Sequence, residues 1–262
     1  ARFIVAGTPS GVTLAPEGGA HQSTITPSVG MELPNLTYIE PTFGGALDWL
    51  LCDALGRIAA GNVHNPTATP SDEGAYYFRL TTRPIDQSAF TKAVERMGEP
   101  VLRRQVLSGG YRLVDAFESY PELTQLRNEG QHVPVVHLVS CGAVMPEVLA
   151  ASAELADEGI AAHVVDVTSP DRWYTAWQRT IRQGVRTATT PSIPGALRVA
   201  FPERAPIVTI QDGASQAHAW LGIALGVTGA SLGVDGFGQS GTVPDLYELN
   251  DLNSGSIVNA AI

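Results

Sequence analysis

Residues 14–24, L-A-P-E-G-G-A-H-Q-S-T, place one carboxylate and one imidazole on a segment whose other side chains are uncharged. Gly18 and Gly19 lie between Glu17 and His21, and glycine lets the backbone approach a ligand closely. An unhindered histidine can donate or accept a proton near neutral pH, and a nearby glutamate can hold the tautomer of its ring. By composition alone a polar surface loop is the commoner interpretation, so the pattern suggests proton transfer without proving it.

The other motifs that suggest chemistry are weaker. The glycines of residues 221–238 do not have the G-x-G-x-x-G spacing of a dinucleotide site. The D-G-F-G at residues 235–238 resembles a kinase motif only loosely, because no catalytic-loop partner is present. None of the six histidines pairs with Cys, Asp or Glu at metal-ligand spacing. Three lie in or beside predicted strands and one follows a strand, and all four are interpreted as structural: His132, His137, His163 and His218.

Composition excludes several classes of protein. The chain has 262 residues, of which 44% are hydrophobic and 16% charged, which is typical of a globular protein. Its net charge of −10 argues against nucleic-acid binding. No apolar run is long enough to span a membrane. Cys52 and Cys141 have no metal or redox spacing and are predicted to be buried, and so few cysteines favour a reducing, cytoplasmic compartment. The low charge suggests that a partner or further domains cover part of the surface.

Periodicity divides the first part of the chain into strands and one helix. Residues 1–7 and 35–41 are predicted as buried strands, and residues 75–82 as a third strand. Leucines and alanines at helical spacing predict an amphipathic helix over 44–59. Residues 62–74 are rich in Pro, Asn and Thr and predict an exposed loop. A beginning in the middle of a strand is expected of a fragment, a processed chain or one half of a split polypeptide.

The last part of the chain alternates strands with helices. Strands are predicted at 133–139, 160–167 and 205–213. Helices follow at 145–159, at 169–184 with Ser169 as the cap, and at 217–225. One or two short helices close the chain. This alternation predicts an α/β fold in which helices cover both faces of mostly parallel sheets, giving three-layer α/β/α domains. Residues 87–130 show no strong period and are interpreted as a connecting segment.

Two segments together resemble a known family. Residues 7–41, G-T-P-S-G-V-T-L-A-P-E-G-G-A-H-Q-S and onward, resemble the second half of the pyrimidine-binding domain of transketolase-like, thiamin-diphosphate-dependent enzymes. Transketolases carry D-G-P-T-H-Q, a segment like M-P-N-L and a strand ending in proline, which match residues 17–22, 33–36 and Pro41. Residues 237–247, F-G-Q-S-G-T-V-P-D-L-Y, are similar to the end of the family's C-terminal domain. The resemblance covers nearly the whole chain.

The motifs favour one branch of this family. G-T-P-S-G, T-L-A-P-E-G-G-A-H, E-P-T-F and V-D-G-F-G-Q-S are similar to the homodimeric pyruvate dehydrogenase component, which decarboxylates a 2-oxo acid and passes the acyl group to a lipoyl carrier. Arg83 favours the transketolase branch, since transketolases carry an arginine there that contacts the sugar phosphate. A third interpretation is a non-catalytic module for dimerisation or assembly, because the main cofactor motifs are not found in the sequence.

The resemblance implies a domain plan and a site. Residues 1–86 match half of the pyrimidine-binding domain, and residues 131–262 match the C-terminal domain. His21 matches the catalytic histidine and Glu17 the acidic member of its loop, while Gln22 and Arg83 are expected to bind substrate. Thiamin diphosphate and magnesium are the implied cofactors, with their main binding motifs outside this chain. The implied partners are the N-terminal part of the enzyme or a second copy, a lipoyl acyltransferase and a 2-oxo acid.

Overall fold

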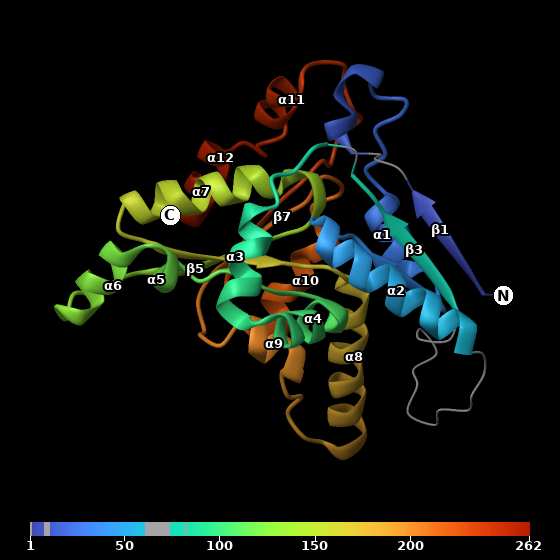
Figure 1. Ribbon diagram of the computed structural model, residues 1–262, viewed down its shortest axis with the longest axis horizontal. Coiled ribbons are helices and arrows are strands. Elements are labelled where there is room, and N and C mark those ends of the chain that lie inside the picture. The colour runs from blue at the N-terminus through green and yellow to red at the C-terminus, as the bar shows by residue number, and fades with distance from the viewer. Residues whose placement is uncertain (1, 8–10, 61–73, 82) are drawn as a thin grey trace.

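The computed structural model describes residues 2–7, 11–60, 74–81 and 83–262 (Figure 1). They form a three-stranded sheet followed by a five-stranded sheet, with helices packed against both. The loop predicted at residues 62–74 lies outside the described residues apart from Gly74. No helix of the described ranges is long and apolar enough to cross a membrane.

The first sheet is parallel, in the order β1-β3-β2. Helix α1 packs against β2 and β3. On the opposite face, Leu50 of α2 belongs to the same buried cluster as Ile39 of β2 and Phe78 of β3. The predicted helix over 44–59 is therefore confirmed. The strands of this sheet and the helices packed on it are β1 (Phe3–Gly7), α1 (Thr26–Glu32), β2 (Leu36–Ile39), α2 (Gly44–Ala60) and β3 (Ala75–Arg79).

Strand β1 differs from its prediction as a buried strand. Phe3 and Val5 are 45% and 44% exposed. β1 pairs only with β3, so it is an edge strand. On the face that carries α1, an open groove between β1 and that helix is lined by Phe3, Val5, Val29 and Leu33. Apolar side chains thus indicate a buried strand only where a neighbouring element covers them.

The second sheet has the order β4-β6-β5-β7-β8, parallel except for the antiparallel edge strand β4. Helices α7 and α12 contact one another over one face, while α9 and α10 belong to the other. The three-layer α/β/α arrangement with mostly parallel strands is therefore confirmed. Its elements are β4 (Tyr111–Val114), β5 (Val135–Ser140), α7 (Met145–Asp157), β6 (Ala161–Asp166), α8 (Pro170–Thr187), α9 (Gly195–Ala200), β7 (Ile207–Ile210), α10 (Gln216–Leu225), β8 (Gly229–Leu232), α11 (Val243–Leu249) and α12 (Ser254–Ala261).

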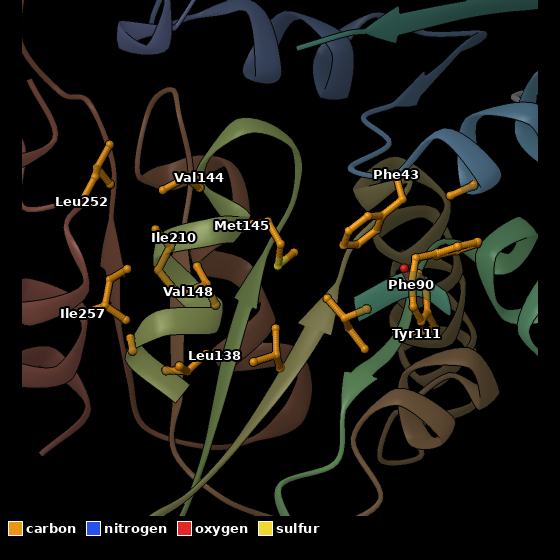
Figure 2. Packing of buried hydrophobic residues seen from close by; sticks show 14 of the residues in the cluster. Phe43, Phe90, Tyr111, Leu138, Val144, Met145, Val148, Ile210, Leu252 and Ile257 are labelled. Atoms are coloured by element: carbon orange, nitrogen blue, oxygen red, sulfur yellow. The ribbon is translucent and has the colours of Figure 1, made fainter. Parts of the chain in front are cut away.

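Alternation along β5 divides the core between the two faces. Leu138 lies in the cluster with Val148 of α7 and Ile257 of α12, as Figure 2 shows. Val139, the next residue, packs in a second cluster with Trp173 of α8. Successive side chains of a strand point to opposite faces, so a nearly continuous apolar run fits a strand covered on both sides.

The predicted connecting segment contains ordered elements. β4 extends the second sheet along β6, although it is only four residues long and includes Arg112. Such a short strand with a charged residue gives no clear period, which is why the pattern was missed. The domain boundaries at 86 and 130 stay predictions. The other elements of the segment are α3 (Ser88–Met97), α4 (Glu99–Ser108), α5 (Ala116–Ser119) and α6 (Pro121–Asn128).

Two local predictions have opposite outcomes. Ser169 caps α8 as expected, since its side chain accepts a hydrogen bond from the Arg172 backbone N–H, and Pro170 takes the first helical position. Cys141 is buried, but the prediction that Cys52 is buried is wrong. Cys52 lies on α2 away from the face that carries Leu50, so helical position decides its exposure.

Candidate active site

Glu17 is the last residue of the 3-10 helix η1 (Val12–Glu17), and His21 lies on the exposed turn that follows it. The turn is closed by a hydrogen bond from the His21 backbone N–H to the Gly18 carbonyl, 3.0 Å long. Gly18 has a φ of 77°, a conformation that favours glycine. Within the described ranges no hydrogen bond joins the side chains of Glu17 and His21. The imidazole is thus free to meet a ligand, and its tuning by Glu17 stays a prediction.

Gln22 is placed differently from a typical substrate ligand. Its side chain is only 5% exposed. Its Nε2 donates to the carbonyl oxygens of Ala15, at 3.2 Å, and Gln239, at 2.9 Å. Both contacts hold the turn in place, and the predicted role of Gln22 in substrate binding stays a prediction.

The contact with Gln239 brings two distant motifs together. A Cβ atom on Gly19 would collide with the carbonyl of Gly238, and one on Gly18 would approach the Ser240 hydroxyl to 2.5 Å. The E-G-G-A-H-Q and D-G-F-G-Q-S segments, each singled out in the sequence, therefore pack directly on one another. Asp235 in turn accepts hydrogen bonds from the Ser215 backbone N–H, at 2.9 Å, and hydroxyl, at 2.7 Å. The C-terminal domain thus supplies one wall of the turn.

Asp212, at the carboxyl end of β7, holds the beginning of η1. Its carboxylate accepts hydrogen bonds from the backbone N–H groups of Val12, at 2.8 Å, and Thr13, at 3.4 Å, and from the Thr13 hydroxyl. The Thr13 hydroxyl also lies 2.6 Å from the hydroxyl of Tyr247 in α11. Figure 1 shows the blue segment that contains η1 beside α11. Burial raises the pKa of Asp212, and the Arg79 charge and Thr13 oppose that shift.

Sequence reasoning missed Asp212 and Tyr247. The available signal was the I-Q-D-G segment, because side chains at the carboxyl end of a parallel strand lie where α/β folds place ligands. Tyr247 ends the L-Y of the family resemblance and was not expected to contact the site. Neither residue is near the loop in sequence, so only the fold brings them to it.

A buried ion pair lies beneath the site. Arg79 and Glu40, at the ends of β3 and β2, form a salt bridge and have side chains no more than 5% exposed. Arg79 also donates to the backbone carbonyl of Asp212, and Gln211 Nε2 donates to Glu40 at 3.1 Å. Burial alone lowers the pKa of Arg79, but the Glu40 charge holds it above its usual value. These contacts join the carboxyl ends of the strands in both sheets.

Arg83 is held by the C-terminal domain. Its guanidinium lies 2.9 Å from the Glu147 carboxylate and donates to the Ala143 carbonyl at 3.1 Å. It also donates to the Tyr247 hydroxyl at 3.3 Å. The residues border a groove of about 340 Å³ to which Glu248 adds a second carboxylate. A phosphate would have to compete with Glu147 for Arg83, so its role in substrate binding stays a prediction.

The structural histidines lie inside the second sheet. His137 and His163 stack with ring centroids 5.6 Å apart. His163 accepts a hydrogen bond from the Ala116 backbone N–H at 3.0 Å, and its other nitrogen lies 3.2 Å from the Glu203 carboxylate. Burial lowers the pKa of His137 to about 4. These contacts serve the packing of the domain, as the interpretation of His137 and His163 expected.

The described residues do not fit the implied metal. No group of three or more His, Cys, Asp or Glu side chains within the described ranges is arranged to hold a metal ion. The carboxylates beneath the site are occupied, Glu40 by Arg79 and Asp212 by the η1 backbone. The described carboxylates therefore offer no ready set of ligands for magnesium.

Comparison with known proteins finds a family that matches the second half of the chain. The transketolase-like TK C-terminal domain family matches residues 125–253. No curated protein sequence matches this chain significantly. A transketolase from Campylobacter jejuni subsp. jejuni NCTC 11168 is similar with a TM-score of 0.65 and 16% identity, over 98% of this chain and 30% of that one. A transketolase from Leishmania mexicana has a TM-score of 0.61 and 18% identity, over 97% and 29%.

A third structure differs in its length. A split-gene transketolase described as an inactive beta4 tetramer has a TM-score of 0.55 and 18% identity, over 98% of this chain and 64% of that one. This chain therefore spans about 30% of the full transketolases and less than two thirds of the split-gene protein. The likeness establishes the fold, and the family match agrees with the resemblance seen in the motifs.

Proposed function

We propose that this chain, whose residues 125–253 match the transketolase-like TK C-terminal domain family, supplies the histidine side of a thiamin-diphosphate-dependent active site. The reaction proposed is ketol transfer between sugar phosphates, as in transketolases. The family match and the similarity to solved transketolases favour this reaction over the pyruvate dehydrogenase reaction that the motifs first favoured.

The observation that carries the proposal is an exposed imidazole on a firmly held turn. His21 is exposed, while the residues that anchor its turn, Gln22 and Asp212, are buried. A catalytic group gains most from being held in one geometry while its reacting atoms stay accessible. A turn that served only as a surface loop would not need buried anchors from another domain.

The role proposed for His21 is to move protons and to hydrogen-bond the substrate. An imidazole within hydrogen-bond reach of a substrate hydroxyl or carbonyl can act as donor or acceptor. Glu17, four residues earlier, adds a negative charge to the same turn. Thiamin diphosphate and magnesium would be bound by another part of the enzyme or by a second copy.

A pyruvate dehydrogenase activity is the second candidate. The D-G-F-G of residues 235–238 favours it, and in the structure this segment packs on the turn that carries His21. Its partners would then include a 2-oxo acid and a lipoyl acyltransferase. A non-catalytic assembly module is the third candidate. A cytoplasmic location, expected from the few cysteines, belongs to the proposal in each case.

An assay with the chain joined to the N-terminal part of the enzyme distinguishes the candidates. Thiamin diphosphate and magnesium are added, and transfer from a ketose phosphate is followed beside carbon dioxide release from pyruvate and branched 2-oxo acids. Ketol transfer without carbon dioxide is the expected result. Carbon dioxide release from an oxo acid would support the dehydrogenase reaction in its place. Neither activity, with the assembly intact, would support the assembly module.

Cofactor binding tests the division of the site. We expect the chain alone to show no tight binding of thiamin diphosphate with magnesium in calorimetry, whereas the assembled enzyme binds both. Tight binding by the chain alone would contradict the proposal that another part holds the cofactor.

A further inference from the structure

We propose that Asp212 is a positioning residue through which the C-terminal domain sets the pose of the turn that carries His21. The inference rests on the proposed function, since it concerns the same turn. It assigns the C-terminal domain a role in positioning the site, although none of the predicted site residues belongs to that domain.

Asp212 makes contacts that a single-point anchor would not. Its two carboxylate oxygens accept hydrogen bonds from two consecutive backbone N–H groups, of Val12 and Thr13, and from the Thr13 hydroxyl. Two consecutive N–H groups fix the direction of the chain as well as its position. Hydrogen bonds to a charged acceptor are stronger than neutral ones, and Asp212 is only 2% exposed. The start of η1 is therefore fixed in orientation.

The approach of the chain to Asp212 depends on Gly11. A Cβ atom at Gly11 would collide with the carboxylate of Asp212. Glycine at this position lets the backbone come close enough for the Val12 N–H to reach the carboxylate at 2.8 Å. The sequence of the turn is thus adapted to a carboxylate that lies 200 residues away.

Asp212 is itself fixed by the domain junction. Its backbone carbonyl accepts a hydrogen bond from Arg79, which is paired with Glu40. The Thr13 hydroxyl that it binds is also held by the Tyr247 hydroxyl at 2.6 Å. The anchor therefore joins Arg79 of β3 and Tyr247 of α11 to Asp212, which follows β7.

The far end of the turn is held separately, by the Gln22 amide on the Gln239 carbonyl. η1 and the turn run between these two anchors, and His21 is next to the second one. Releasing Asp212 frees the first end while leaving Gln22 in place. The expected consequence is a turn that stays attached to the domain but samples several poses, with His21 in the productive one for a smaller fraction of the time.

Hydrogen–deuterium exchange of the full chain tests the anchor without requiring activity. Asp212→Ala removes all the contacts of the carboxylate, Asp212→Asn keeps one acceptor oxygen, and Thr13→Val removes only the partner hydroxyl. We expect exchange over residues 11–22 to become about tenfold faster in Asp212→Ala, with smaller increases in the other two variants. Asp157→Asn, an exposed substitution at the end of α7, is the control and should match the wild type.

The outcomes distinguish a positioning role of Asp212 from a general contribution to the stability of the fold. Faster exchange confined to residues 11–22, with β5 and β6 unchanged, supports the proposal. Should Asp212→Ala unfold the chain, Thr13→Val decides, because it leaves the buried carboxylate and its backbone contacts in place. Unchanged exchange over residues 11–22 in both Asp212→Asn and Thr13→Val would overturn the proposal.

Kinetics of the assembled enzyme supply a second readout. A positioning role predicts that kcat falls about tenfold in Asp212→Asn while KM changes less than about twofold. The reason is that a smaller fraction of the molecules holds the turn with His21 in the productive pose. If the rate fell only because fewer molecules were folded, dividing it by the active-site concentration would restore the wild-type kcat. That result would overturn the proposal. If His21→Ala keeps full activity while the exchange result holds, the proposed function fails and the anchoring by Asp212 does not.

Discussion

Two regions of the molecule hold their buried polar groups in different ways. In the five-stranded sheet, the Glu203 carboxylate pairs with Arg112 of β4 and lies 3.2 Å from His163 of the neighbouring strand β6. In the three-stranded sheet and its turn, the buried polar contacts reach across to the other domain, through Arg79 and through Val12 and Thr13. The difference teaches that the first set of contacts stays within one sheet, whereas the candidate site takes its geometry from contacts between the two sheets.

The largest expected effect is at the junction of the two sheets. Arg79→Met leaves Glu40 as a buried, uncompensated charge and should destabilise the chain by about 3–5 kcal/mol. The double variant with Glu40→Gln should recover part of this loss, because it removes the unpaired charge. Urea unfolding followed by circular dichroism measures both. A loss below about 1 kcal/mol in Arg79→Met would show that the two sheets do not depend on this pair.

The covered and open sheet faces offer a matched pair of valines. Val139 of β5 is fully buried and Val5 of β1 is 44% exposed. Val139→Ala should cost about 1–3 kcal/mol in unfolding free energy, because it leaves a cavity in a packed core. Val5→Ala should cost less than about 0.5 kcal/mol. Equal costs in urea titrations would contradict the contrast between a covered sheet and an open edge.

Much of the fold was predictable because it follows from periodicity. The helix over 44–60 and strands β5, β6 and β7 have apolar residues at the spacing that burial requires. β4 was missed because four residues with one arginine carry too little pattern, and the exposure of Phe3 and Val5 follows from strand order, which the sequence does not state. Periodicity reports which face of an element is apolar, and packing decides whether that face is covered.

The candidate site was predictable only in part. His21, Glu17 and Gln22 were found because they lie together in the sequence. Asp212 was missed because its contact with Val12 spans 200 residues and no local pattern encodes it. A motif can name the residue that does chemistry, while the residue that holds it in place becomes visible only in the folded chain.

A smaller effect is expected from pH, through His218 at the junction. Burial lowers the pKa of His218 from 6.5 to about 4. Between these values the unfolded chain binds the proton and the folded chain does not, so stability falls as pH falls from about 6.5 to 4. Relative to His218→Asn, which does not titrate, the wild type should lose on the order of 1–3 kcal/mol between pH 7 and pH 4.5. The same loss in the variant would show that other groups, such as His137, dominate.

The measurement that tests the central claim most directly compares two exposed histidines in the assembled enzyme. His21 lies on the anchored turn, and His132 lies before β5, away from the candidate site. With thiamin diphosphate and magnesium present, His21→Ala should lower kcat for ketol transfer by about 100-fold while leaving the unfolding free energy unchanged. His132→Ala should behave as the wild type in both respects. Equal activity of the two variants would contradict the claim that this chain supplies the catalytic histidine.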